Sequence, residues 1–126
     1  MDNMQMWTLL PHPDTPEPAV RTLSVAVERD GAQLWLRYVV ECDMEAIQWP
    51  APAAPEFTDG LWQHTCFEVF VRGGQGAAYV EGNFSPSSQY AFYGFTGHRA
   101  GMTPYPDAAD PAIGLDGAHD QFALEA

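Results

Sequence analysis

Two glutamates in strand-like segments are the residues of this chain whose type and placement best suit chemistry. Glu68 and Glu81 each lie within a run of apolar, β-branched and aromatic residues, and glycines separate the two runs. Burying a carboxylate is costly unless it is paired or hydrogen-bonded, so simple core building does not account for either residue. Because carboxylates accept strong hydrogen bonds from hydroxyl and amino groups, Glu68 and Glu81 are the first candidates for a binding site.

Polar and aromatic side chains nearby complete this candidate site. Asn83 shares a strand face with Glu81, because residues two apart on a strand point to the same side. Arg99 offers a guanidinium donor to sugar hydroxyls, and Trp62, Tyr90 and Phe92 are the predicted stacking platform. The alternative is an internal ion-pair network, open also to Arg37, that fixes strand register and binds nothing.

The sequence leaves two further kinds of site open. An enzyme that cleaves glycosidic bonds needs two carboxylates about 5 to 9 Å apart, which Glu68 and Glu81 on paired strands can approach. Haem held between a histidine and a methionine would draw on His98, Met102 or Met44, although the chain has no CxxCH attachment motif. We predict no catalytic residue, no metal ion and no cofactor, with haem as the alternative.

Two predicted hairpins position these residues. The first joins strands at Val20–Glu28 and Gln33–Cys42 through a tight turn at Asp30-Gly31. Apolar and polar residues alternate along both strands, which is typical of strands with one buried face. The second hairpin joins His64–Val71 and Ala77–Phe84 around a glycine-rich turn, and it carries both glutamates.

The rest of the chain is predicted to be one aromatic strand between loops. Gln89–Phe95 is the strand, residues 43–60 form a long loop with a possible helical turn at Asp43–Gln48, and residues 97–120 are loop. Met1–Pro18 is an extended, proline-rich lead-in. The final residues, QFALEA, read like the first half of another strand, which predicts a domain that lacks its C-terminal strands.

Short strands separated by glycine and proline, without a sustained helical period, predict an all-β fold. The expected architecture is an antiparallel β-sandwich of the immunoglobulin-like or jelly-roll kind. A chain of 126 residues is long enough for one core and too short for two, so we predict a single domain over residues 1–126.

Charge and composition exclude several partners. The chain has 17 acidic residues, 5 arginines and no lysine, for a formal net charge of −12. Phosphate backbones and anionic membrane surfaces are repelled by such a surface, so we expect neither nucleic acid nor membrane as a partner. The N-terminus lacks the basic and apolar regions of a secretory signal, which predicts a cytoplasmic protein with Cys42 and Cys66 as free thiols. The oligomeric state stays open.

Several short motifs resemble the bacterial DOMON-like domain proteins. The motifs are Asp59-Gly60-Leu61-Trp62, His64-Thr65-Cys66-Phe67-Glu68, Tyr79-Val80-Glu81, Asn83-Phe84-Ser85-Pro86 and Arg99 with Gly101-Met102. The resemblance is strongest over residues 59–102, and His12-Pro13 and the stretch from Leu34 to Pro50 also fit it. The chain departs from the pattern at Gly82 and Tyr90.

This resemblance implies a β-sandwich that binds a ligand on a concave sheet face or at a loop end. The wider group is similar to the DOMON domains of haem- and sugar-binding proteins and to family 9 carbohydrate-binding modules. The leading prediction is therefore a non-catalytic module for a carbohydrate or similar polyhydroxylated small molecule. A haem-binding electron-transfer domain and a protein-interaction scaffold without a small ligand are the alternatives.

Overall fold

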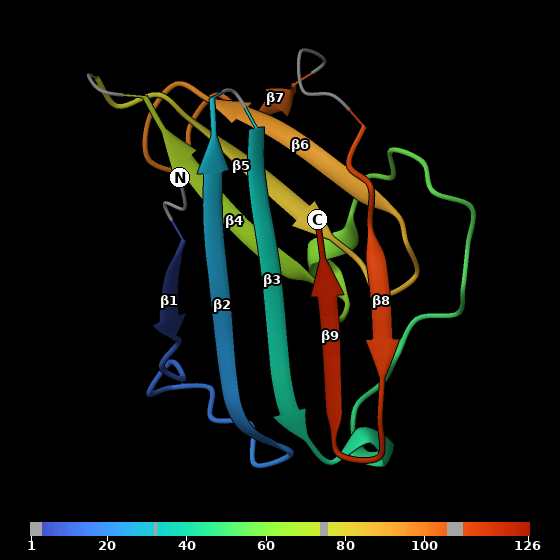
Figure 1. Ribbon diagram of the computed structural model, residues 1–126. Helices are drawn as coiled ribbons and strands as arrows, with labels where there is room; N and C mark the ends of the chain where they lie inside the picture. The colour runs from blue at the N-terminus through green and yellow to red at the C-terminus, as the bar shows by residue number, and fades with distance from the viewer. Residues whose placement is uncertain (1–3, 32, 74–75, 106–109) are drawn as a thin grey trace. The chain divides into compact units, whose positions relative to one another are not determined.

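The computed structural model describes residues 4–31, 33–73, 76–105 and 110–126. It is built of β-strands in two antiparallel sheets with two short 3₁₀ helices, which confirms the predicted all-β antiparallel class (Figure 1). The chain forms two compact units, Met1–Gln48 with Ala112–Ala126, and Trp49–Pro111. Within the described ranges, no helix is long and apolar enough to cross a membrane. The prediction of a single domain stays a prediction.

The first unit holds a five-stranded sheet in the order β1-β2-β3-β9-β8. Its strands are β1 Gln5–Thr8, β2 Val20–Asp30, β3 Gln33–Cys42, β8 Gly114–Gly117 and β9 Gln121–Glu125, and the 3₁₀ helix η1, Met44–Ala46, follows β3. Strands β2 and β3 form the predicted hairpin and are the longest strands of the structure (Figure 1). Gly31 at their turn has a φ of +59°, the left-handed conformation that a tight hairpin turn requires.

Alternation along β3 builds the buried face of this sheet. Leu36, Tyr38 and Val40 are buried, as their two-residue spacing predicts. On the neighbouring strand β9, Leu124 pairs with Tyr38 and is fully buried. Burial of apolar side chains contributes about 25 cal/mol per Å² of apolar surface removed from water, and this is the main stabilising contribution of such a face.

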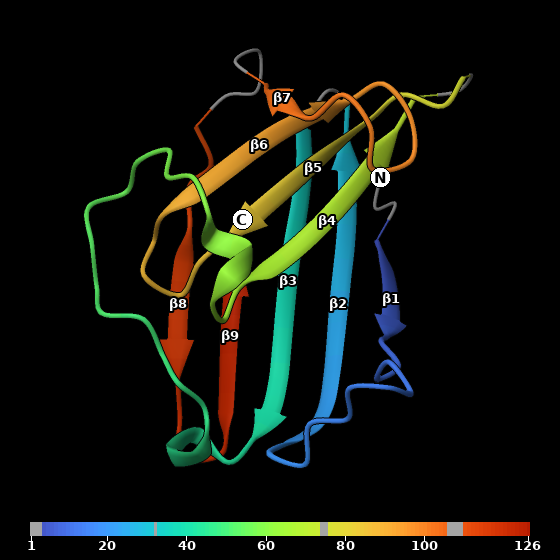
Figure 2. The same ribbon diagram turned by 180° about the vertical axis from the view of Figure 1, so that it is seen from behind.

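The second unit holds a four-stranded sheet in the order β4-β5-β6-β7 (Figure 2). Its strands are β4 Phe67–Arg72, β5 Tyr79–Phe84, β6 Tyr90–Phe95 and β7 Thr103–Pro104, and the 3₁₀ helix η2, Leu61–Gln63, precedes β4. The predicted hairpin around the glycine-rich turn is confirmed as β4 and β5. Strand β4 begins three residues later and ends one residue later than predicted, and β5 begins two residues later and ends where predicted. The aromatic strand β6 pairs with β5 along its whole length.

Three edge strands correct the sequence prediction. Strand β1 lies in the segment expected to be an extended lead-in, and β7 and β8 lie in the segment expected to be loop. Each has at most four residues and pairs with only one described strand. Strands this short show no alternation to detect, and β8 carries a glycine at each end, so pairing with a longer neighbour is what makes them strands.

Candidate functional site

The register of the second sheet gathers the predicted polar residues on one face. Glu68 pairs with Asn83, and Glu81 pairs with Phe70 on one side and with Tyr93 on the other. Directly paired residues on neighbouring strands point to the same side of a sheet. Glu68, Glu81 and Asn83 therefore share one face, as the alternation in the sequence predicts.

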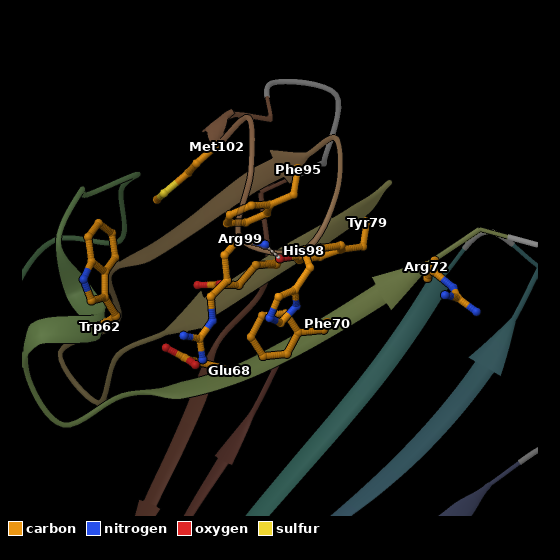
Figure 3. A pocket seen from close by; sticks show the side chains of 10 residues that line it. Trp62, Glu68, Phe70, Arg72, Tyr79, Phe95, His98, Arg99 and Met102 are labelled. Carbon is orange, nitrogen blue, oxygen red and sulfur yellow. Dashed lines mark hydrogen bonds between the residues drawn. The ribbon is translucent and has the colours of Figure 1, made fainter. Parts of the chain in front are cut away.

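A cavity of about 690 Å³ opens over this face (Figure 3). Strands β4, β5 and β6 form its floor, and η2 and the loop after β6 contribute the other side chains. Its lining residues are Trp62, Glu68, Phe70, Arg72, Tyr79, Glu81, Phe95, His98, Arg99 and Met102. The cavity thus includes four of the seven predicted binding residues: Trp62, Glu68, Glu81 and Arg99.

The loop between β6 and β7 places Arg99 at the cavity. Backbone bonds at 3.0 Å close this loop, one from Thr96 N–H to the Ala100 carbonyl and one from Ala100 N–H to the Gly97 carbonyl. Arg99 N–H donates to the Tyr79 hydroxyl at 3.0 Å, which ties the loop to β5. Figure 3 shows the Arg99 side chain extending toward Glu68. Arg99 itself has a φ of +53°, a left-handed conformation that is rare for a residue other than glycine.

Aromatic rings flank the carboxylates in two groups. Tyr79 and Phe95 stack with centroids 4.7 Å apart, and Phe70 meets Tyr79 edge to face at 6.0 Å. Trp62 meets Tyr93 edge to face at 5.6 Å. In Figure 3, Trp62 stands on one side of the cavity and Phe70 with Tyr79 on the other, and Arg99 and Glu68 lie between them. The cavity therefore has apolar walls around a polar centre, the usual composition of a small-molecule site.

The electrostatics of the face centre on Glu81. Partial burial, and then the nearby charge of Glu68, raise the pKa of the Glu81 carboxyl above its usual value, while the Asn83 amide lowers it. Neither amide atom of fully buried Asn83 has a hydrogen-bond partner of normal geometry within the described residues. The Asn83 amide therefore acts on Glu81 as a nearby dipole and not through a well-formed bond. A buried amide without a hydrogen-bond partner is destabilising, which sets this part of the sheet apart from ordinary core.

Cys66 is not a nucleophile in this setting. Burial and the adjacent Glu68 carboxylate raise the pKa of the Cys66 thiol to about 12. Its Sγ lies 3.8 Å from a carboxylate oxygen of Glu68. Since the thiolate is the reactive form, Cys66 is unreactive at neutral pH, and both cysteines are free.

Tyr90 and Phe92 do not belong to this face, which corrects the predicted stacking platform. Phe92 pairs with Gly82 and Tyr90 pairs with Phe84, so both point to the side of the sheet opposite Glu81. There Phe92 lies 6.0 Å from Phe84 and 6.1 Å from Tyr90, measured between ring centroids. The aromatic rings that line the cavity are those of Trp62, which was predicted, and of Phe70, Tyr79 and Phe95, which were not.

The sequence contains a signal for two of the three cavity rings that the prediction omits. Phe70 and Tyr79 lie two residues from Glu68 and Glu81, so counting by two along each strand assigns them to the same face. Phe95 is placed there by the register between β5 and β6, in which it pairs with Tyr79. That register depends on the turn between the strands and cannot be counted from Glu81 alone.

The haem candidates do not form a suitable pair of axial ligands. His98 and Met102 line the cavity, whereas Met44 belongs to η1 of the first unit. His98 and Met102 come from one tight loop, and two axial ligands must approach the iron from opposite sides of the macrocycle. Among the described residues, no group of three or more histidine, cysteine, aspartate or glutamate side chains is placed to hold a metal ion.

No protein-family model, curated protein or solved structure matches this chain. The resemblance to the DOMON-like proteins therefore stays a prediction, and the site has to be interpreted from its own geometry.

Proposed function

We propose that this protein is a non-catalytic binding module for a carbohydrate or similar polyhydroxylated small molecule, which occupies the cavity over the second sheet. The observation that carries the proposal is the composition of that cavity. Two carboxylates, of Glu68 and Glu81, and two guanidinium groups, of Arg72 and Arg99, line the cavity together with four aromatic rings. Polar groups of this kind exchange hydrogen bonds with hydroxyls, and rings cover the apolar faces of a sugar.

The dimensions of the cavity support a ligand of modest size. A volume of about 690 Å³ lies within the range of about 300 to 1,000 Å³ usual for small-molecule sites. The rigid parts of the site lie on strands β4 and β5, and the guanidinium group is on a loop that hydrogen-bonds to β5. A site supported by strands is pre-organised, which lowers the entropy cost of binding.

Calorimetric titration with a panel of neutral and amino sugars tests the proposal. Binding to the wild type, with loss in Glu81→Gln and no change in Glu28→Gln, is the expected result. Glu28 is a matched control, because it is also a partly buried strand glutamate, on β2 of the first unit. Thermal unfolding of both variants belongs to the same experiment. If Glu81→Gln unfolds the protein, Glu81 is a structural residue, and if no sugar binds, the proposed function is wrong.

One observation favours hydrolysis of a glycosidic bond as a second candidate function. Glu68 and Glu81 are diagonal neighbours on paired strands, a relation that separates Cβ atoms by about 7 Å. A carboxyl with a raised pKa is the usual general acid of such enzymes, and the pKa of Glu81 is raised. Release of nitrophenol from aryl glycosides by the wild type, and not by Glu81→Gln, would establish this candidate in place of the binding module.

A further inference from the structure

We infer that the ligand carries a positively charged amino or ammonium group, seated on Glu81 between the aromatic rings of the cavity. This inference rests on the proposed function, because it concerns the same cavity and narrows the class of its ligand.

The neighbours of Glu81 are mostly aromatic. Phe70 and Tyr93 pair with it across the sheet, and Tyr79 and Asn83 are its same-face neighbours on β5. The stacked pair of Tyr79 and Phe95 and the edge-to-face pair of Trp62 and Tyr93 continue this surround. Aromatic faces attract an organic cation that lies within about 6 Å of a ring centroid, so rings around a carboxylate suit an ammonium group.

None of the positively charged side chains described at the cavity forms an ion pair with Glu81. Among the described residues Glu81 makes no ion pair, and the charge that acts on it most is the like charge of Glu68. Figure 3 shows Arg99 extending toward Glu68 and Arg72 pointing away from the other lining residues. A cation above Glu81 would thus meet a carboxylate that no described residue pairs with an opposite charge.

The energetic cost of this arrangement favours a cationic ligand over a neutral one. A partly buried carboxylate beside a second carboxylate loses solvation and is repelled, and neutral hydroxyl groups relieve only part of that cost. A cation compensates for both the lost solvation and the repulsion between the carboxylates. The net charge of −12 also attracts cations to the protein as a whole. The fully buried, unpartnered Asn83 amide on the same face is a further polar group not consumed by the fold.

The ionised form of Glu81 binds the cation, so affinity must depend on pH. Among the described residues, the other titratable and charged groups on this face, in contact with it or lining the cavity are Asp59, Cys66, Glu68, Arg72, Tyr79, Tyr93, His98 and Arg99. Because burial and Glu68 raise the pKa of Glu81, protonation begins at a higher pH than for an exposed glutamate. Affinity for the cation therefore falls as pH is lowered through the pKa of Glu81.

The test uses probes matched in shape and different in charge. Glucose, glucosamine and N-acetylglucosamine are titrated calorimetrically at pH 6, where the amine of glucosamine is protonated, and tetramethylammonium serves as a cation without hydroxyls. The expected result is binding of glucosamine about 10-fold tighter than glucose, with N-acetylglucosamine behaving like glucose. Glu81→Gln should remove this preference, and Glu28→Gln should retain it.

A second pair of variants tests the aromatic contribution. Trp62→Leu is expected to weaken tetramethylammonium binding about 2- to 5-fold, and Trp35→Leu, an exposed tryptophan of β3, should leave it unchanged. Equal binding of glucose and glucosamine would overturn the inference and leave the proposed function intact. Tetramethylammonium binding that depends on Glu81, without binding of any sugar, would support the inference and overturn the polyhydroxylated ligand. No binding by any probe would overturn both.

Discussion

The two sheets of this protein differ in how the charged residues on their strands are paired. In the first sheet, Arg37 is paired in register with Glu125 and forms an ion pair with it, and Thr22 donates to the paired Glu41 at 3.0 Å. In the second sheet, Glu81 is paired with two aromatic residues. Matched cross-strand pairs are what a sheet needs for register and solubility. Glu28 of the first sheet also pairs with a ring, that of Trp35, so the second sheet is distinguished by the cavity in which Glu68 and Glu81 lie together with four aromatic rings.

Truncating the core of the first sheet should have the largest effect on stability. Leu124 on β9 is fully buried, so Leu124→Ala is expected to lower the free energy of unfolding by about 2 to 5 kcal/mol. Leu115→Ala on β8, where the side chain is 42% exposed, should cost less than about 1 kcal/mol. Urea denaturation of both variants measures the difference. Similar losses in the two variants would contradict this prediction, because the exposed Leu115 would then contribute as much to stability as the buried Leu124.

A strained loop glycine gives the next largest effect, and it is confined to the site. Gly101 has a φ of +72°, and a Cβ added there would lie 2.3 Å from Thr96 Oγ1. Gly101→Ala is therefore expected to cost about 1 to 2 kcal/mol locally and to displace the loop that carries Arg99. Gly97→Ala in the same loop is the control, because its Cβ would meet nothing within 4 Å.

Ligand affinity and thermal unfolding together check this prediction. Gly101→Ala should weaken binding in the cavity, and Gly97→Ala should not. Unchanged affinity in Gly101→Ala would show that the position of Arg99 is irrelevant to ligand binding. Only the strand residues of the second sheet would then distinguish it from the first sheet.

Neutralising Glu81 should give the smallest effect on stability, and the size of this effect depends on pH. The pKa of Glu81 in the folded state is raised above the usual 4.5, so its favourable contribution is complete below that pH and is lost as pH rises through the raised pKa. Glu81→Gln should therefore raise the melting temperature relative to wild type at pH 7, and this gain should disappear near pH 4.

The first sheet again supplies the control for this measurement. Glu41 accepts a hydrogen bond from Thr22, so Glu41→Gln offers no comparable gain at pH 7. Thermal unfolding of wild type and both variants at the two pH values isolates the effect of Glu81 from that of the other carboxylates. A gain for Glu81→Gln that is the same at both pH values would contradict a raised pKa.

Much of the fold could be predicted because it follows from local alternation. The bounds of β3, Gln33–Cys42, are those predicted, and the side chains of Glu68, Glu81 and Asn83 share the predicted face. Both results depend only on the two-residue period of a strand and on turn residues between strands. The short edge strands β1, β7 and β8 were missed because no such period fits in two to four residues.

The composition of the site could be predicted only in part, because it depends on register. Alternation shows that Tyr90 and Phe92 share one side of β6 and that Tyr93 and Phe95 share the other. It does not show which side faces Glu81. The turn from β5 to β6, in which Ser85 N–H donates to the Gln89 carbonyl at 2.9 Å, sets the pairing of Glu81 with Tyr93. A shift by one residue would have placed the predicted rings over the carboxylates.

The sequence by itself determined the all-β class, the two hairpins and the presence of two carboxylates on one face of the second hairpin, since each follows from interactions between residues close together in the chain. The tertiary structure decided which rings surround Glu81, how the loop carrying Arg99 is tied to Tyr79, and that a cavity of about 690 Å³ lies over them. These features depend on contacts between residues far apart in the chain, and cross-strand register and loop closure fix such contacts only when the whole sheet has formed.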